Sequence, residues 1–453
     1  MAPHRNSSGQ GDPWAPYSPT PDAPWDLRRV VHLHRRAGFA ATWPEIRRDL
    51  KDGPEASVSR VLAGTSRLGE IPQEFESTST LLADAAVASG DVYRLRAWWV
   101  FRMLGSPDPL GERLTLMWHG HFATAASKVE DLALMRRQNE TFRKLARAPF
   151  GELLNEAVRE PALLTYLDAP SNRKDHPNEN LARELMELFT LGVGNYTEAD
   201  VQEAARALTG WRVEEGRFDE SPSKHDDGAK SILGRSGTWS GSDLLTILLD
   251  HPATPRRVAW RLSDLFLGEG AVDPAAIDDL AGRLKDDGLD VGKGVATILR
   301  SRAFFGSTNL RTRVNGPVEQ VIGACRALIP DGSTPSTLLL ADWIGRVGQE
   351  LFEPPNVGGW PGARSWLNAR SLIARANFAA ALVGGKAVGL PGPIDAQALA
   401  REQGRGTSAG DVSDAGSALL LGVESKLAPG EDTPEAARRA LAEVLASPEA
   451  QVC

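Results

Sequence analysis

The sequence predicts a mostly α-helical protein: one large multi-helix single domain with irregular loops and at most a small β-hairpin. Apolar residues recur at i, i+3 and i+4 through most of the chain, which is the periodicity of amphipathic helices. Alternating runs with β-branched residues are scarce, and only 212–239 has the pattern of a hairpin or an irregular loop. The 453 residues, 42% of them apolar, can bury a sizeable core without a disulfide or a structural metal.

Capping and proline signals place the helices along the chain. Pro44 stands in the first turn of a predicted helix, and Thr197 with Asp200 has the spacing of a capping box. An Ala- and Leu-rich run predicts one continuous helix over 81–104. The predicted helices are 81–104, 110–122, 130–147, 151–159, 179–191, 198–210, 242–249, 254–267, 275–285, 291–300, 314–328, 337–351, 365–385 and 434–446.

Composition shifts divide the chain into four segments. Residues 1–24 are polar and rich in Pro, Ser and Gly, which predicts a disordered N-terminal segment. The main helical domain is expected over 25–387, and the Gly- and Pro-rich stretch 388–432 is expected to be a linker or an insertion. Residues 433–453 are expected to form a C-terminal helix that packs on the main domain.

The charge balance indicates a soluble acidic protein. The chain has 51 Lys and Arg against 59 Asp and Glu, a net charge of −8, which argues against a dedicated nucleic-acid binder. The two cysteines exclude a disulfide framework and a Cys-rich zinc module, and Cys325 is expected to be a buried free thiol. The adjacent arginines are expected to lie on solvated helix faces. These pairs are Arg28-Arg29, Arg35-Arg36, Arg47-Arg48, Arg136-Arg137 and Arg256-Arg257.

Targeting signals are not apparent in the sequence. No apolar run reaches the roughly 18 residues that a transmembrane helix needs, and 1–25 has no apolar signal-peptide core. We therefore expect no membrane span and a cytoplasmic location.

A His-x-His pair stands near the end of the predicted helix 110–122. Neutral imidazole is the commonest metal ligand, so His119 and His121 are candidate metal ligands, and His121 is also a candidate catalytic residue. Residues two apart lie roughly 200° apart around a helix, so His121 is expected to face the core and His119 to face away. Both can bind one ion only if the helix ends near Gly120. A buried, hydrogen-bonded structural His121 is the alternative.

The predicted helix 179–191 places Asn180, Glu184 and Glu187 on one face. Paired carboxylates near a histidine can hold a divalent cation or divide the acid and base roles of a reaction. Glu184 and Glu187 are therefore candidate catalytic residues, and Asn180 and Arg183 are candidate ligand-binding residues. The alternative is an ordinary amphipathic helix with solvated ion pairs.

Two loops add further candidates. In the first, His225 and Asp226 are candidate metal ligands, and Lys230 is a candidate for binding an anion; a plain polar turn is the alternative. The second is a rigid aromatic loop over 352–368, whose indoles and polar side chains suit stacking on a sugar or another planar ligand. It serves equally well as a packing plug. Its candidate ligand-binding residues are Trp360, Arg364, Trp366 and Asn368.

Six sequence blocks, in order, resemble the bacterial domain-of-unknown-function 1800 family. They are RRAGF at 35–39, WHGHFAT at 118–124, PNEN at 177–180 with ELMELFTLG at 184–192, AARALTGW at 204–211, PPNV at 354–357 with WPG at 360–362, and LASPE at 445–449. The resemblance implies a single large helical domain with no established reaction. It also implies a sulfatase-like protein, encoded nearby, as a partner. Many relatives resemble exported proteins, whereas this chain shows no export signal, and Gly120 replaces the more usual Asn between the histidines.

The leading functional hypothesis is a metal-dependent hydrolase with a His/Glu site. Glu184 would act as general base or metal ligand, His121 as ligand or acid, and the Trp360 loop as a stacking wall. The cofactor is not identified by the sequence; a divalent metal ion is the candidate. The alternative is a non-catalytic helical binding or assembly protein in which the same residues form a buried polar network. A haem or redox protein with His119 or His121 as axial ligand is a third hypothesis.

Overall fold

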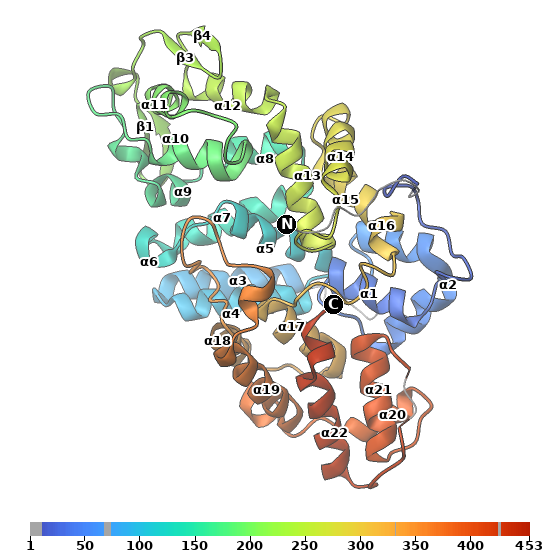
Figure 1. Cartoon of the computed structure of the whole chain (residues 1–453). Helices are drawn as coiled ribbons and strands as arrows, with labels where there is room; N and C mark the ends of the chain where they lie inside the picture. The colour runs from blue at the N-terminus through green and yellow to red at the C-terminus, as the bar shows by residue number, and fades with distance from the viewer. Residues whose placement is uncertain (1–10, 68–73, 331, 425–426) are drawn as a thin grey trace.

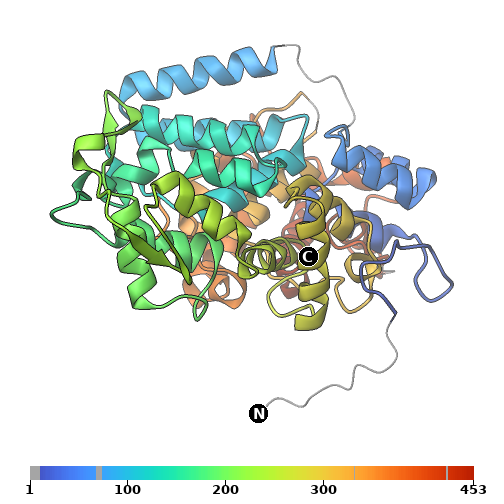
Figure 2. The same ribbon diagram turned by 90° about the horizontal axis from the view of Figure 1, so that it is seen from above.

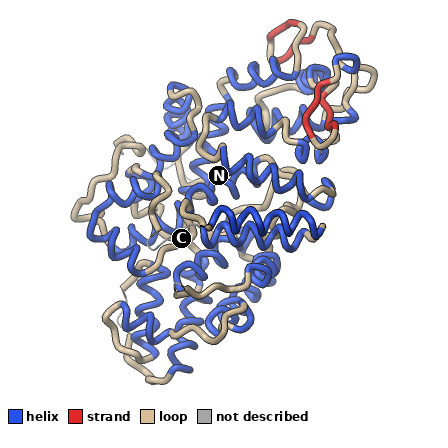
Figure 3. The backbone as a smooth tube through the Cα atoms, turned by 180° about the vertical axis from the view of Figure 1, so that it is seen from behind, coloured by secondary structure: helices blue, strands red, loops and turns tan. Residues whose placement is uncertain are grey.

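The computed structural model describes residues 11–67, 74–330, 332–424 and 427–453. Over these residues the chain forms 22 α-helices and two small antiparallel hairpins, which confirms the mostly helical fold. All four strands lie at one end of the molecule (Figure 3).

The helices in the first half of the chain begin and end as follows. They are α1 Leu27–Ala37, α2 Trp43–Leu62, α3 Phe75–Ser89, α4 Val92–Gly105, α5 Pro109–His121, α6 Ala126–Val129, α7 Leu132–Lys144, α8 Phe150–Ala157, α9 Pro161–Tyr166, α10 Asn180–Glu184 and α11 Glu198–Ala207. Short 3-10 turns follow at Ala169–Ser171 and Pro222–Lys224, and a π-helical turn spans Leu185–Thr190.

The helices in the second half are α12 Gly241–Asp250, α13 Ala253–Phe266, α14 Pro274–Asp286, α15 Val291–Leu299, α16 Arg302–Phe305, α17 Pro317–Leu328, α18 Thr337–Val347, α19 Ala369–Gly384, α20 Ala396–Glu402, α21 Ala409–Leu421 and α22 Pro434–Ala446. Further 3-10 turns lie at Ala363–Trp366, Lys386–Val388 and Pro448–Gln451. Strand β1 Trp211–Glu214 pairs with β2 Arg217–Glu220, and β3 Lys230–Ile232 pairs with β4 Arg235–Gly237. The stretch 212–239, expected to be a hairpin or an irregular loop, thus takes part in two hairpins.

The buried core consists of two apolar clusters. The first gathers residues of α5, α8, α11, α12, α13 and α15, and the second gathers residues of α4, α17, α18, α19, α21 and α22. In Figure 1 the helices of the first cluster lie above and those of the second below. Seen from above, α3 lies along the outside of the molecule, where it packs on α4 and α7 (Figure 2).

Helix α5 joins the two clusters. Leu114 and Trp118 belong to the first cluster and Leu116 to the second. Apart from Gly120, every residue of α5 is buried, although the helix also contains Glu112, Arg113 and two histidines. A helix enclosed on all sides must satisfy its polar side chains inside the protein. The partners of these buried polar side chains define the candidate site described below.

Glycine and aspartate divide the predicted helix 81–104 into α3 and α4. Gly90 has a φ of +64°, the left-handed conformation that glycine adopts at helix C-termini. The Asp91 carboxylate then accepts a hydrogen bond from the backbone N–H of Tyr93 (2.8 Å) and caps α4. The prediction of one continuous helix is therefore wrong.

The flanking segments make contacts within the fold. Residues 1–10 lie outside the described residues. The described part of the segment expected to be disordered holds a buried Trp14, whose Nε1 donates to the carbonyl of Ala276 (2.9 Å). The stretch 388–432, expected to be a linker or an insertion, contains α20 and α21, and α21 packs on α1 and α22. Helix α22 also packs on α19.

The expectation that the arginine pairs are solvated is wrong for two of the N-terminal ones. Arg29 and Arg36 are buried, and Arg36 donates to the backbone carbonyls of Phe266 (3.2 Å) and Asn309 (3.1 Å). Backbone carbonyls are acceptors that no sequence pattern identifies, which is why the burial of these guanidiniums was missed. Cys325 is a buried free thiol, as expected. No helix among the described residues has the length and hydropathy to cross a bilayer.

Candidate functional site

His119 lies in the core, although it was expected to face away from it. Its Nε2 is 3.0 Å from Nδ2 of Asn139, and its ring contacts Trp99, Phe142 and Phe352. Burial, together with the Arg143 guanidinium, holds the pKa of His119 well below its ordinary value. The ring is therefore a neutral core residue at neutral pH.

His121 is buried among aromatic rings and hydrogen-bonds a backbone carbonyl. Its Nε2 lies 3.0 Å from the carbonyl oxygen of Phe189. The carbonyl of Leu188, one residue earlier, accepts two hydrogen bonds from Arg257 (3.0 and 2.9 Å). Both carbonyls belong to the π-helical turn Leu185–Thr190, where the wider backbone ladder leaves carbonyls free for other donors. The predicted helix 179–191 thus changes from an α-helical to a π-helical hydrogen-bond pattern after Glu184.

Glu184 and Glu187 are half-buried and lie close enough to repel each other. Burial, followed by the charge of Glu187, raises the pKa of Glu184. Glu187 accepts a hydrogen bond from the hydroxyl of Tyr196 (2.7 Å). Arg183 forms ion pairs with Glu179 and Glu198 at the surface, and Asn180 donates to Asp168 (3.3 Å). In the described residues no hydrogen bond joins His121 to Glu184 or Glu187.

The candidates of the first loop form a hydrogen-bonded turn. His225 Nδ1 is 2.9 Å from the carbonyl oxygen of Thr209. Arg206 binds Asp226 through two nitrogens and lowers the pKa of that carboxyl to about 2. Lys230 is buried, which lowers its pKa, and it donates to the carbonyls of Asp226 and Gly228. Across the described ranges no group of three His, Cys, Asp or Glu side chains is placed to hold a metal ion.

The second loop divides its candidates between two roles. Trp360 and Trp366 line a cavity, with Trp366 buried and Trp360 anchored through Nε1 to the carbonyl of Glu350 (3.0 Å). Asn368 instead caps α19 by accepting from the N–H of Ser371 (3.0 Å). Arg364 is exposed and does not line that cavity.

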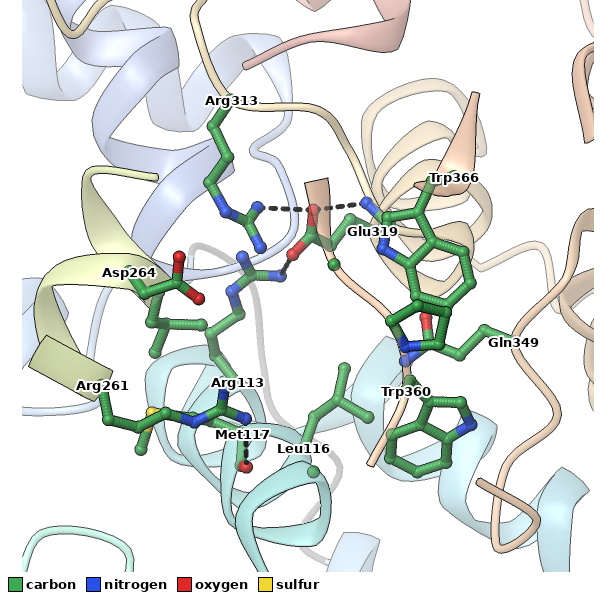
Figure 4. Close-up of a pocket in the computed structure, with 15 residues that line it drawn as sticks. Arg113, Leu116, Met117, Arg261, Asp264, Arg313, Glu319, Gln349, Trp360 and Trp366 are labelled. Atoms are coloured by element: carbon green, nitrogen blue, oxygen red, sulfur yellow. Dashed lines mark hydrogen bonds and ion pairs between the residues drawn. The ribbon is translucent and has the colours of Figure 1, made fainter. Parts of the chain in front are cut away.

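The cavity beside the two tryptophans is the candidate site, and we call it the arginine pocket. It has a volume of about 110 Å³ and lies where α5, α13 and the start of α17 meet the loop 360–366. Three arginines lie on one side of it and the two indoles on the other (Figure 4). Its charged and polar lining residues are Arg113, Arg261, Arg313, Asp264, Glu319 and Gln349.

Glu319 is the anchor of this pocket. Its carboxylate forms ion pairs with Arg113 and with Arg313 (2.7 Å), and it accepts the N–H of Gly316 (2.8 Å) at the start of α17. Burial would raise its pKa, but the two guanidiniums outweigh burial and hold the pKa well below the ordinary range. Glu319 is therefore ionised throughout the neutral range.

Donors remain after Glu319 is satisfied. The Arg113 side chain is 1% exposed, and its Nε and Nη2 groups have no acceptor among the described residues. Arg261 uses one Nη2 hydrogen for the carbonyl of Met117 (3.3 Å), and its buried Nε has no acceptor in the described part of the chain. Burial lowers the pKa of Arg261, and Asp264 opposes that shift. Three guanidiniums against two carboxylates leave one positive charge in excess among the groups that line the cavity.

A comparison with known protein families identifies the family of this chain. A model described as a protein of unknown function (DUF1800) matches residues 32–452. The chain belongs to the DUF1800 family. No curated protein and no solved structure matches it.

In this DUF1800 protein the glycine between the two histidines lines the arginine pocket. A Cβ atom on Gly120 would stand 3.0 Å from Nη2 of Arg261 and 3.9 Å from Cε3 of Trp360. Gly359, with a φ of +86°, lies against the carbonyl of Gly120 so closely that a Cβ there would collide with it. Two glycines thus let the Trp360 loop rest on α5, and position 120 faces the cavity between a guanidinium and an indole.

Sequence reasoning missed the arginines of this DUF1800 site. Arg113 stands inside the strongly apolar run 110–122, and a charged residue at such a position signals a buried polar contact. Glu319 follows Gly316 at capping-box spacing, a second usable signal. Arg261 carries no such signal, because its position follows only from long-range contacts such as its hydrogen bond to the carbonyl of Met117 on α5.

Proposed function

We propose that this protein binds a small anion in the arginine pocket. The observation that carries the proposal is the charge of the cavity lining: three guanidiniums face two carboxylates, and among the described residues no ion pair joins Arg261 to a carboxylate. A buried cation with spare N–H groups is costly unless an anion or water satisfies it. Charge-assisted hydrogen bonds from guanidinium to carboxylate or phosphate are among the strongest available in proteins.

Replacing Arg261 with Met tests this proposal. We expect the variant to lose anion binding by about tenfold or more, measured by calorimetric titration, because one donor set and the excess charge disappear. The unfolding free energy should stay unchanged or rise by ~1 kcal/mol, since removing an unpaired buried charge is not destabilising. Met117 loses one long hydrogen bond in the exchange.

The matched control is Arg256→Met, on the same helix. Arg256 is 56% exposed and pairs with exposed Asp278, so its removal should leave anion affinity unchanged. Equal affinity in Arg261→Met and the parent protein, or equal losses in both variants, would overturn the proposal.

The hydrolase hypothesis rests on a second observation. Burial and Glu187 raise the pKa of Glu184, which suits a carboxyl group that gives or takes a proton. We expect metal analysis of the purified protein to find one divalent ion per chain if the hydrolase is metal-dependent, and Glu184→Gln to lose it. A metal-free parent protein removes the metal-dependent form of the hypothesis. The sulfatase-like partner, the cytoplasmic location and the lack of a nucleic-acid partner stay predictions.

A further inference from the structure

The arginine pocket has two chemically different sides. Guanidinium groups from α5 and α13 form one side, and Figure 4 shows the indoles of Trp360 and Trp366 across from them, with Leu116 below. A bare inorganic anion would satisfy the guanidiniums, but its other oxygens would face indole and aliphatic carbon. Oxygen atoms held against apolar surface without hydrogen bonds are unfavourable. The lining therefore suits a ligand that is anionic at one end and apolar at the other.

The charge of the lining residues limits the charge of the ligand. Asp264 and Glu319 oppose Arg113, Arg261 and Arg313, so the cavity carries one uncompensated positive charge. A monoanion neutralises this excess. A dianion such as sulfate would bring a second negative charge close to two carboxylates, and like charges at short range repel each other.

The volume of the cavity limits the size of the ligand. Its volume of about 110 Å³ is well below the roughly 300–1,000 Å³ typical of pockets for drug-sized ligands. Gly120 lines the cavity, and a Cβ there would stand 3.0 Å from Nη2 of Arg261, so a side chain at this position would narrow the space between Arg261 and Trp360.

We infer that the ligand is a small monocarboxylate with a short apolar body. This inference rests on the proposed anion-binding function and names its ligand class. The carboxylate lies against the Arg261 guanidinium, on the cationic side of the cavity that Arg113 shares, and the apolar body lies beside Gly120 against the indole of Trp360. The inference concerns binding of the carboxylate and includes no chemical reaction.

A titration panel tests the ligand class. Acetate, butyrate, phosphate and sulfate, as sodium salts at equal ionic strength, are titrated into the full-length protein and followed by calorimetry. We expect butyrate to bind about tenfold or more tightly than sulfate and phosphate, and more tightly than acetate. Sulfate or phosphate binding as well as butyrate overturns the ligand class and leaves the anion-binding proposal intact. Binding of none of the four overturns both.

Two variants test the placement of the ligand. Gly120→Asn fills the space over position 120, so butyrate affinity should fall by about tenfold or more. Gly282→Asn is the control, because a Cβ at Gly282 on α14 meets no atom within 4 Å. Asp264→Asn raises the excess charge to two, so it should strengthen sulfate binding more than butyrate binding.

Either of two results overturns this placement. The first is an unchanged butyrate affinity in Gly120→Asn while the melting temperature matches that of Gly282→Asn. The second is an unchanged ratio of sulfate to butyrate affinity in Asp264→Asn, which would show that the charge of the lining does not select the ligand. If Gly120→Asn lowers the melting temperature below that of the control, Gly120→Ala replaces it, because that change adds a single carbon at the same place.

Discussion

Lowering the pH from 7.5 to 5.5 is expected to destabilise the folded protein by about 4 kcal/mol. His32, His119 and His121 are buried, and burial holds the pKa of each ring well below 6.5. The neighbouring arginines lower these pKa values further, Arg36 beside His32 and Arg143 beside His119. The unfolded chain takes up protons near pH 6.5, whereas the folded chain does not, so each ring costs about 1.4 kcal/mol per pH unit below that point.

The buried histidines lower the free energy of unfolding only on the acidic side of about pH 6.5. The stability is complete above about pH 6.5 and is lost as the pH falls, because only the unfolded state binds the protons. The buried carboxylates Glu112 and Glu319 act in a separate window, since their lowered pKa values matter only below about pH 5. Urea unfolding at a series of pH values measures the slope, and we expect close to three protons taken up on unfolding.

Single substitutions assign the effect to individual rings. His119→Gln should remove about one proton from the slope, and His121→Gln another. His176→Gln is the control, because that ring is exposed and its loss should leave the slope as it is. A stability that stays flat between pH 7.5 and 5.5 would contradict the prediction and would show that these rings can be protonated in the folded protein.

Replacing Glu319 with Gln is expected to cost about 3–5 kcal/mol of unfolding free energy. The change removes the partner of Arg113, which is 1% exposed, and of Arg313. Removing one partner of a buried ion pair leaves an uncompensated charge that the interior solvates poorly. The same change weakens the cap of α17, since Glu319 also accepts the N–H of Gly316.

The control for this variant is a matched Glu→Gln change at an exposed carboxylate. Glu76 is 69% exposed, and its buried partner Arg102 keeps a second ion pair with Glu112, so Glu76→Gln should cost less than about 1 kcal/mol. Adding Arg113→Met to Glu319→Gln should restore part of the loss, because the stranded guanidinium is gone. A double variant less stable than Glu319→Gln alone would contradict the explanation by unpaired charge.

Local signals predicted most of the fold, and long-range packing decided the site. Helices α12, α13 and α22 fall within about one residue of their predicted bounds, and Thr197 with Asp200 forms the expected capping box. Gly90 was overlooked as a helix end because the apolar pattern continues across it. The π-helical turn after Glu184 could not be foreseen, because the side chains that hydrogen-bond its carbonyls, His121 and Arg257, reach it from distant parts of the chain.

The candidate site was predicted only in part for the same reason. Trp360 and Trp366 were named as ligand-binding residues, and both line the arginine pocket. The sequence made His121 a candidate because imidazole is a common metal ligand, yet one backbone carbonyl and several aromatic rings surround it. Arg261 and Arg313 look in the sequence like the many surface arginines of an acidic protein, whereas Arg113 stands inside the apolar run 110–122. Long-range packing brings the three together.

The enclosure of α5 also couples the pocket to the whole molecule. This helix packs in both apolar clusters, so the wall that carries Arg113 and Gly120 exists only when both clusters have assembled. An occupant of the pocket is therefore bound by the complete native state and not by a partly folded half. A ligand bound there would therefore stabilise the whole folded chain, and the gain in stability would increase with the ligand concentration.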